Sequence, residues 1–233
     1  MKSYYLFFLI SFFCLYFKNS YTHEIKENQI NPILKKFILD NPGLIEKSLQ
    51  NYSKIKEKKE FETAIKDLNK IQNPTISGKK ADVIIYEFFD YNCGYCKSVL
   101  PEMLQVFQED ENISIVFVEL PILHQSSVTA ALAALAAHRQ KKYMEFHINL
   151  MKHNGRIDEK VLFEIAKKID LNVSQFKKDF SNSKLMSMVD KNRIIAKKLK
   201  LKGTPAFIIG NKIYPYAMKK EEIVRAINLT RKE

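Results

Sequence analysis

The segment Cys93-Gly94-Tyr95-Cys96 contains the residues of this chain best suited to chemistry. It follows a strand-like apolar run, Val83 to Phe89, and opens a helix-like segment, Lys97 to Gln108. A thiol in the first turn of a helix lies near unpaired backbone N–H groups and the positive end of the helix dipole. Both favour the thiolate, which is the nucleophile in disulfide exchange. We therefore expect Cys93 to attack and Cys96 to resolve the mixed disulfide.

The other cysteine, Cys14, lies in a segment that resembles an export signal. Lys2 precedes an apolar stretch from Tyr4 to Phe17, and polar residues follow. This stretch is short for a membrane span and fits a signal peptide over residues 1–22, with cleavage before His23. The mature chain then has two cysteines, both in the motif. Exported proteins ordinarily use cysteines as structural crosslinks, so a single closely spaced pair indicates a reactive disulfide, Cys93–Cys96, with no other cofactor.

Two other uses of the pair are weaker. A structural disulfide across two intervening residues would close a very small loop and constrain the unfolded chain little. A zinc site would need two more ligands, and His147 and His153 stand far beyond Cys96 without the compact spacing of a zinc finger. We expect the histidines to be ordinary residues on partly exposed helices.

The composition supports a globular protein without a nucleic-acid partner. A hydrophobic fraction of 46% is enough for a large core. The formal net charge is +12, from 38 Lys and Arg against 26 Asp and Glu. The lysines are scattered along the chain and the aromatic residues resemble core positions, so we expect no nucleic-acid binding. The charge indicates at most a mild preference for acidic partners or membrane surfaces.

Residues 23–73 form a predicted helical N-terminal extension. A short amphipathic helix is expected over Ile30 to Leu39, and Asn41 with Pro42 predicts the start of a longer helix that runs to about Ile71. The apolar stripe of this helix has two interpretations, which the sequence leaves open. It packs on its own domain, or residues 24–71 form an oligomerisation arm of a homo-oligomer.

Residues 74–233 predict an α/β (α+β) domain with a thioredoxin-like fold. The order is a strand, Val83 to Phe89, a helix containing Pro101, and a strand, Ile113 to Leu120, which together make a parallel βαβ unit. An all-helical insertion follows at about 125–201. A hairpin of Ala206 to Ile209 with Lys212 to Tyr214, and a terminal helix, complete the domain.

The chain resembles the DsbA-like family of bacterial periplasmic thiol–disulfide oxidoreductases over residues 80–230. The resemblance lies in the segment Glu87 to Lys97, in Pro101, and in the segment Gly203 to Phe207. It implies unfolded or mispaired exported proteins as substrates, and a membrane redox partner that resets the cysteine pair. It also implies a cis bond before Pro205, which turns the backbone of Thr204 toward the cysteines, where an extended substrate can pair with it.

The resemblance also implies roles for residues around the pair. Glu87 matches a buried acidic position, where a carboxyl with a raised pKa can relay the proton that Cys96 loses. Gly94, Tyr95, Thr204 and Pro205 are expected to contact the substrate. The dipeptide Gly94-Tyr95 and Thr204 match periplasmic disulfide isomerases instead of DsbA, so oxidase and isomerase activity are both open.

The sequence therefore predicts an exported protein disulfide oxidoreductase, located in the periplasm, that forms or reshuffles disulfides. The competing class is a non-catalytic periplasmic chaperone or adaptor that keeps the thioredoxin-like fold only to bind unfolded chains. Removal of both thiols separates these classes, because an adaptor would protect its clients without them.

Overall fold

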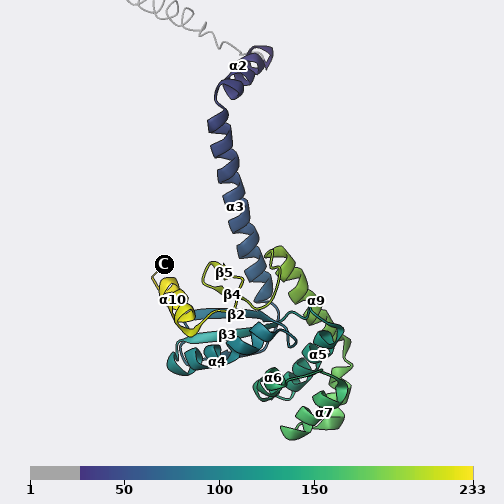
Figure 1. The fold of residues 1–233 in the computed structure, drawn as a ribbon. Coiled ribbons are helices and arrows are strands. Elements are labelled where there is room, and N and C mark those ends of the chain that lie inside the picture. The colour runs from purple at the N-terminus through teal and green to yellow at the C-terminus, as the bar shows by residue number, and fades with distance from the viewer. Residues whose placement is uncertain (1–26, 233) are drawn as a thin grey trace, which may run out of the picture. The chain divides into compact units, whose positions relative to one another are not determined.

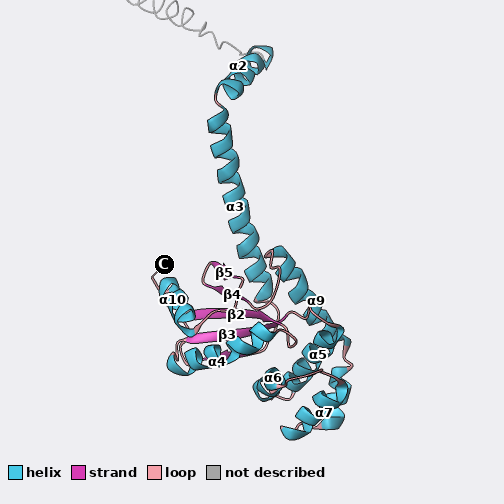
Figure 2. Cartoon of the chain, in the orientation of Figure 1, coloured by secondary structure: helices cyan, strands magenta, loops and turns pink. Residues whose placement is uncertain are grey.

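The computed structural model describes residues 27–232, drawn in Figures 1 and 2. The predicted signal peptide, Cys14 and the cleavage before His23 lie outside the described residues. Two compact units make up the chain, one ending at Lys56 and the other beginning at Glu57. Within residues 27–232, no helix combines the length and the apolar character needed to cross a membrane.

The first unit consists of α2 (Glu27–Asp40) and the first part of α3 (Pro42–Leu68). The expected helix start at Pro42 is confirmed, although α3 ends at Leu68, three residues before the predicted Ile71. Asn41 joins the two helices. Its side-chain amide donates to the Phe37 carbonyl at 2.8 Å, and its own carbonyl accepts the Leu44 N–H at 3.1 Å. Asn41 thus satisfies the end of α2 as well as the start of α3.

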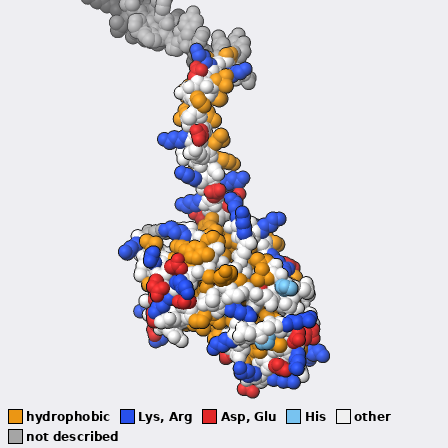
Figure 3. All heavy atoms as spheres, in the orientation of Figure 1, with side chains coloured by type: hydrophobic (Ala, Val, Ile, Leu, Met, Phe, Trp, Pro, Cys, Tyr) orange, Lys and Arg blue, Asp and Glu red, His pale blue; other side chains and the backbone are white. Residues whose placement is uncertain are grey.

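Apolar side chains of the first unit are exposed. They recur on α2 with the spacing of one helix face and continue on α3 (Figure 3). The exposed set is Ile30, Ile33, Leu34, Phe37, Ile38, Leu39, Leu44, Leu49, Tyr52 and Ile55, which we call the arm surface. Among the described residues of the first unit, nothing buries this surface.

The last part of α3 behaves differently, because it packs within the second unit. Ala64 and Leu68 are fully buried, and Phe61 and Ile65 are partly buried against the same cluster as Phe88. The apolar stripe predicted over residues 24–71 is therefore divided. Its C-terminal part covers the sheet, as the first interpretation has it, and its N-terminal part is exposed.

The second unit is built on a mixed sheet with strand order β1-β3-β2-β4-β5. The strands are β1 (Thr75–Ser77), β2 (Val83–Phe89), β3 (Ile113–Glu119), β4 (Ala206–Ile209) and β5 (Lys212–Tyr214). Strands β2 and β3 are parallel and joined through α4 (Gly94–Glu109), which confirms the βαβ unit, while the other pairs are antiparallel. Strand β1 was not predicted, because its three residues are too few to show an alternating pattern.

Alternate residues of the central strands face two different cores. Ile85, Phe89 and Phe117 face α4, α10 (Lys220–Thr230) and the helical insertion. Tyr86 and Phe88 face the end of α3 and α9 (Ser183–Lys198). Figure 1 shows α4 and α9 on opposite sides of β2 and β3. The strands are covered on both faces, as their continuous apolar composition predicts.

The insertion is all-helical, as expected. Its helices are α5 (Gln125–Arg139), α6 (Tyr143–Lys152), α7 (Glu159–Lys168), α8 (Val173–Phe180) and α9. Asp158 caps α7 by accepting the Val161 N–H at 3.0 Å. His124 occupies the N-cap position of α5, and its N–H donates to the Ser127 hydroxyl at 3.2 Å. The alanines of α5 are buried, which brings this helix close to its neighbours.

Candidate active site

Cys93 occupies the N-cap of α4, at the junction of strand and helix that the sequence predicts. Its backbone is extended, with φ −84° and ψ 113°, and its Sγ accepts the Cys96 N–H at 3.4 Å. The Cys93 N–H donates to the Asp90 carbonyl at 3.0 Å, which closes a turn between β2 and α4. The attacking sulfur therefore lies where the first N–H groups of the helix are unpaired.

The two cysteines differ in access to solvent. Both carry free thiols; Cys93 is 6% exposed, and Cys96 is 0% exposed. Tyr95, between them, projects into solvent, and a Cβ built on Gly94 would meet nothing within 4 Å. The surface above the start of α4 is therefore open, and Cys93 is the thiol nearer to it.

The two thiols also differ in pKa. Hydrogen bonding from the Cys96 thiol and from backbone N–H groups lowers the pKa of Cys93 to about 6, against the opposing effect of burial. Burial raises the pKa of Cys96 well above that of an ordinary thiol, and its proximity to Cys93 adds to this. At neutral pH the pair therefore holds one thiolate, on Cys93, and one thiol, on Cys96.

Thr204 and Pro205 lie beside the cysteines, as the resemblance implies. The Thr204–Pro205 peptide bond is cis. In its thiol form, Cys93 donates through Sγ to the Thr204 carbonyl at 3.2 Å. The Thr204 hydroxyl is buried and has no hydrogen-bond partner among the described residues. The loop before β4 thus presents backbone polar groups next to the reactive sulfur.

Glu87 lies in β2 beneath the pair. It is 1% exposed, which agrees with the buried acidic position that the resemblance implies. Both carboxylate oxygens lack a hydrogen-bond partner within residues 27–232. Burial, and then the charge of Cys93, raise the pKa of Glu87 to about 8. Its side chain shares the sheet face of Ile85 and Phe89, against which Cys96 and α4 pack.

A second polar group under the site was not expected from the sequence. Tyr91, Glu119, Tyr143 and His147 are all buried and linked by hydrogen bonds. His147 is 0% exposed, so the expectation of a partly exposed histidine is wrong for this residue. Burial lowers the pKa of His147 to about 3 and raises that of Glu119. The only sequence signal was the spacing of Tyr143 and His147, one helical turn apart.

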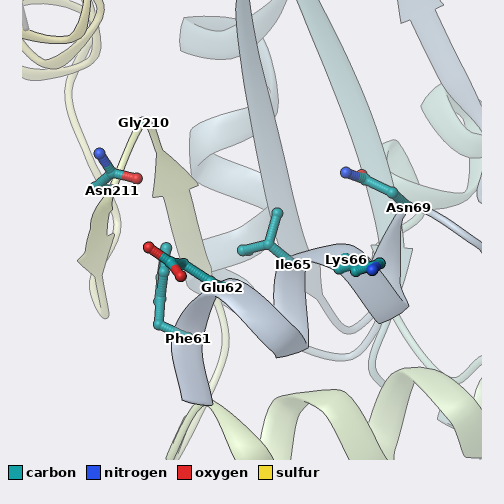
Figure 4. A pocket seen from close by; sticks show the side chains of 7 residues that line it. All are labelled: Phe61, Glu62, Ile65, Lys66, Asn69, Gly210 and Asn211. Carbon is teal, nitrogen blue, oxygen red and sulfur yellow. The ribbon is translucent and has the colours of Figure 1, made fainter. Parts of the chain in front are cut away.

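Within residues 27–232, no three or more His, Cys, Asp or Glu side chains form a group that could hold a metal ion. An open pocket of about 330 Å³ lies between the end of α3 and the hairpin turn, lined by Phe61, Glu62, Ile65, Lys66, Asn69, Gly210 and Asn211 (Figure 4). It includes none of the predicted site residues.

Comparisons with known proteins agree with this geometry. The chain is similar to Probable disulfide bond formation protein D of Bacillus cereus, with 30% identity over 151 residues, which cover 58% of this chain and 69% of that protein. It also matches Na(+)/H(+) antiporter NhaA 1 of Salinispora arenicola at 26% identity, but the match spans only 21% of the antiporter.

Solved structures resemble the chain over most of their own length. A thioredoxin-like oxidoreductase from Silicibacter pomeroyi has 33% identity and a TM-score of 0.66, covering 69% of this chain and 92% of that one. The thiol-disulfide exchange protein alpha-DsbA2 from Wolbachia pipientis has 25% identity and a TM-score of 0.70, covering 74% and 95%. The family model described as DSBA-like thioredoxin domain matches residues 84–228. The chain therefore belongs to the DSBA-like thioredoxin domain family.

Proposed function

We propose that this protein catalyses thiol–disulfide exchange in exported proteins, with Cys93 as the attacking sulfur and Cys96 as the resolving one. The proposal is carried by the position of Cys93 Sγ at the N-terminus of α4, where it accepts the Cys96 N–H at 3.4 Å and has a pKa of about 6. A thiolate stabilised in this way attacks disulfides and also leaves readily from them. The cysteine pair is itself the redox group, so the cycle takes no dissociable cofactor.

The chemical steps follow from this division between the two thiols. In the reducing direction, the Cys93 thiolate attacks one sulfur of a substrate disulfide, and the other substrate sulfur leaves as a thiolate. Cys96 then loses its proton and attacks Cys93 Sγ, which releases the second substrate thiolate and forms the Cys93–Cys96 disulfide. Two electrons pass to the substrate, and the reverse sequence oxidises a dithiol. In isomerisation a substrate thiolate displaces Cys93, and no net electrons move.

Glu87 is suited to carry the proton of the resolving step. Cys96 has a raised pKa and no solvent exposure, so its proton needs a nearby buried acceptor. Ionised Glu87 accepts that proton as Cys96 becomes the attacking thiolate, and protonated Glu87 returns it when Cys96 leaves in the oxidising direction. A carboxyl whose pKa is about 8 exchanges protons readily near neutral pH.

Replacement of Glu87 by Gln is expected to change both stability and rate. Between pH 4.5 and about 8 the folded protein keeps the Glu87 proton and the unfolded chain loses it, so the wild type loses stability as pH rises through this window. Glu87→Gln removes that loss, which amounts to roughly 3–5 kcal/mol at the upper end. Denaturant unfolding at several pH values measures it. The resolving step, followed by decay of a mixed disulfide, is expected to slow.

Glu111→Gln is the matched control for that experiment, because Glu111 is an exposed acid of the same domain. It should leave the pH profile of stability unchanged. An unfolding free energy of Glu87→Gln that keeps the wild-type dependence on pH, together with unchanged decay of the mixed disulfide, would remove Glu87 from the mechanism.

Substrate contacts are proposed for the residues around Cys93. The Thr204 carbonyl, 3.2 Å from Cys93 Sγ, is positioned to accept a backbone N–H from an extended substrate segment, and Pro205, which follows it after a cis bond, is proposed to contact the same segment. Gly94 and Tyr95 line the open side. Ile122 and Leu123 are exposed apolar residues whose N–H groups are bound by Asp90, within the active-site turn. Such an apolar rim suits unfolded chains better than folded proteins.

The periplasm is the compartment we propose for this activity. The signal-like residues 1–22 and the family support it. The proposed substrates fit this compartment, because disulfides form and persist in oxidising compartments outside the cytosol. A membrane redox partner would reset the Cys93–Cys96 pair after each net oxidation or reduction. The resemblance of Gly94-Tyr95 and Thr204 to disulfide isomerases supports reshuffling as the main reaction.

We also propose that the arm surface joins copies of this chain into a homo-oligomer. Ile33 alone is 69% exposed, and nine further apolar residues of the first unit are exposed with it. Burying a side chain of this size contributes about 1.5–3 kcal/mol. The repeat of Ile30, Ile33, Leu34 and Phe37 has the spacing of a helix that packs against other helices. A second copy supplies an identical surface by symmetry.

Charging the arm surface is expected to produce a monomer that oxidises dithiols but no longer reshuffles disulfides. The change is Ile33→Asp with Phe37→Asp, since carboxylates cannot be buried between apolar helices without a large cost. Light scattering after size exclusion measures the assembly. Reactivation of a scrambled multi-disulfide protein, and oxidation of a reduced dithiol peptide, measure the two activities.

The matched control is Ile194→Asp with Leu229→Asp, because both residues are exposed apolar positions of the second unit. This control should keep the wild-type assembly and both activities. Oligomers that survive the arm substitutions would contradict the assembly proposal. A monomeric variant with undiminished reactivation would contradict the link between assembly and reshuffling, and failure of the wild type to reactivate would favour a simple oxidase.

A further inference from the structure

The turn that precedes Cys93 is tied to the helical insertion through three consecutive side chains. Asp90 Oδ2 accepts the N–H groups of Ile122 and Leu123, at 2.9 and 3.0 Å, in the segment leading to α5. Asn92 donates through Nδ2 to the Ser127 hydroxyl of α5 at 2.8 Å. The turn residues on either side of Tyr91 are therefore fixed to the start of α5 and to the segment before it.

Tyr91 makes the deepest of these connections. Its hydroxyl lies 2.9 Å from Nδ1 of His147, in α6, and 3.2 Å from Oε1 of Glu119, at the end of β3. The Tyr143 hydroxyl, also from α6, donates to the same Glu119 oxygen at 2.9 Å. One phenolic oxygen thus joins the active-site turn to both the sheet and the insertion.

The bonds of Tyr91 require a hydroxyl. Oxygen at this position can donate to one neighbour and accept from the other, so it bridges an imidazole and a carboxyl in either proton arrangement. When Glu119 is neutral, its carboxyl O–H donates a hydrogen bond to the Tyr91 oxygen, and the Tyr91 O–H donates to His147 Nδ1. With Glu119 ionised, His147 donates to Tyr91 and Tyr91 to Glu119. A phenylalanine in place of Tyr91 leaves both neighbours without this partner.

This network lies in apolar surroundings, where buried polar groups lower the stability of the fold. The His147 ring packs with centroids 5.0 Å from Phe89 and 4.9 Å from Phe117, and its Nε2 has no hydrogen-bond partner among the described residues. Buried polar groups destabilise a fold unless they are fully bonded, and apolar residues of similar size would pack there at lower cost. The network therefore needs a reason other than stability.

We propose that Tyr91 is a positioning residue for thiol–disulfide exchange: its hydroxyl, held by His147 and Glu119, fixes the turn that presents Cys93 at the N-terminus of α4. The thiolate depends on the alignment of Cys93 Sγ with the Cys96 N–H, 3.4 Å away, and that alignment depends on the preceding turn. Through this turn, the helical insertion influences the reactivity of the Cys93 thiol. This rests on the proposed function.

Tyr91→Phe tests the proposal through the chemistry of Cys93 itself. Titration of the thiolate absorbance and the rate of alkylation by a small electrophile both report on Cys93 without requiring exchange with a protein substrate. We expect the titration midpoint of Cys93 to rise by about half a pH unit, which corresponds to roughly a threefold change in the thiol–thiolate equilibrium. Alkylation below that midpoint should slow by a similar factor.

Two variants serve as matched controls. Tyr86→Phe removes a hydroxyl that donates to Asn69 at 2.6 Å on the opposite face of the sheet. Tyr143→Phe removes the other donor to Glu119 but leaves both bonds of Tyr91. Both are expected to lower stability without moving the Cys93 midpoint.

The outcomes separate a positioning role from a structural one. A Cys93 midpoint unchanged in Tyr91→Phe would overturn the proposal, as would equal shifts in all three variants, which would indicate general loosening of the domain. A third outcome separates this proposal from the proposed function. If the wild type exchanges no disulfides with protein substrates, but the Cys93 midpoint still rises in Tyr91→Phe, the proposed function is contradicted and the positioning role of Tyr91 stands.

Discussion

Cys93→Ala is expected to reduce thiol–disulfide exchange to the uncatalysed rate. At pH 7 a thiol with a pKa of about 6 is about nine-tenths thiolate, whereas one with the ordinary value of 9.0 is about one-hundredth thiolate. The protein therefore raises the concentration of the nucleophile about 90-fold at this residue alone. Cys96 cannot replace it, because its pKa is raised and its side chain has no exposure to solvent.

The measurement is reduction of a disulfide peptide and reactivation of a scrambled protein, each compared with the wild type under the same glutathione buffer. Ser98→Ala is a suitable control, since this residue lies in the same helical turn and its hydroxyl donates to the Tyr95 carbonyl at 2.8 Å. The control should retain full activity. If Cys93→Ala protects unfolded chains as well as the wild type does, and neither protein shows exchange activity, the result would favour the non-catalytic adaptor.

Much of the active site could be predicted from sequence because its chemistry is local. Cys93 and Cys96 are three residues apart, and the strand before them and the helix after them have clear apolar patterns. The position of Cys93 at the start of α4 follows from this order alone. The burial of Glu87 was implied by the family resemblance, and it agrees with the apolar run around this residue, in which every residue of β2 except Ile84 is buried.

The Tyr91 network could not be predicted, since it depends on contacts between distant segments. Tyr91 meets Glu119 and His147 across separations of 28 and 56 residues, and no local pattern pairs a tyrosine with either. His147 was expected to be an ordinary residue on a partly exposed helix. Its burial is decided by Phe89 and Phe117 of the sheet, which pack against its ring.

The surroundings of the long helix α3 also could not be predicted from the local sequence. The sequence left two environments open for the apolar stripe of residues 24–71, and the helix has both. Ala64 and Leu68 are buried because β2 and α9 lie against them, whereas Leu49 and Ile55 are exposed among the described residues of their unit. Periodicity identifies an apolar face of a helix; what covers that face is a property of the tertiary structure or of a partner.

Cys96→Ala is expected to accumulate a mixed disulfide between Cys93 and its substrate. Without the resolving thiol, the Cys93–substrate bond persists until an external thiol attacks it. The variant should also form this complex more slowly, because the Cys96 thiol makes the largest contribution to lowering the pKa of Cys93. A peptide with one activated disulfide, followed by mass spectrometry without reductant, measures both the yield and the rate.

The opposite variant, Cys93→Ala, tests the assignment of the two roles with the same peptide. Cys96 is buried and holds its proton, so this variant should form no mixed disulfide on the timescale of the first. A complex trapped on Cys96 would mean that the roles are reversed. Equal trapping by both variants would mean that burial does not make Cys96 less reactive than Cys93 in solution. A slow, stable complex on Cys93 alone requires both features of the site, a stabilised thiolate at the helix start and a protonated thiol one turn further along α4.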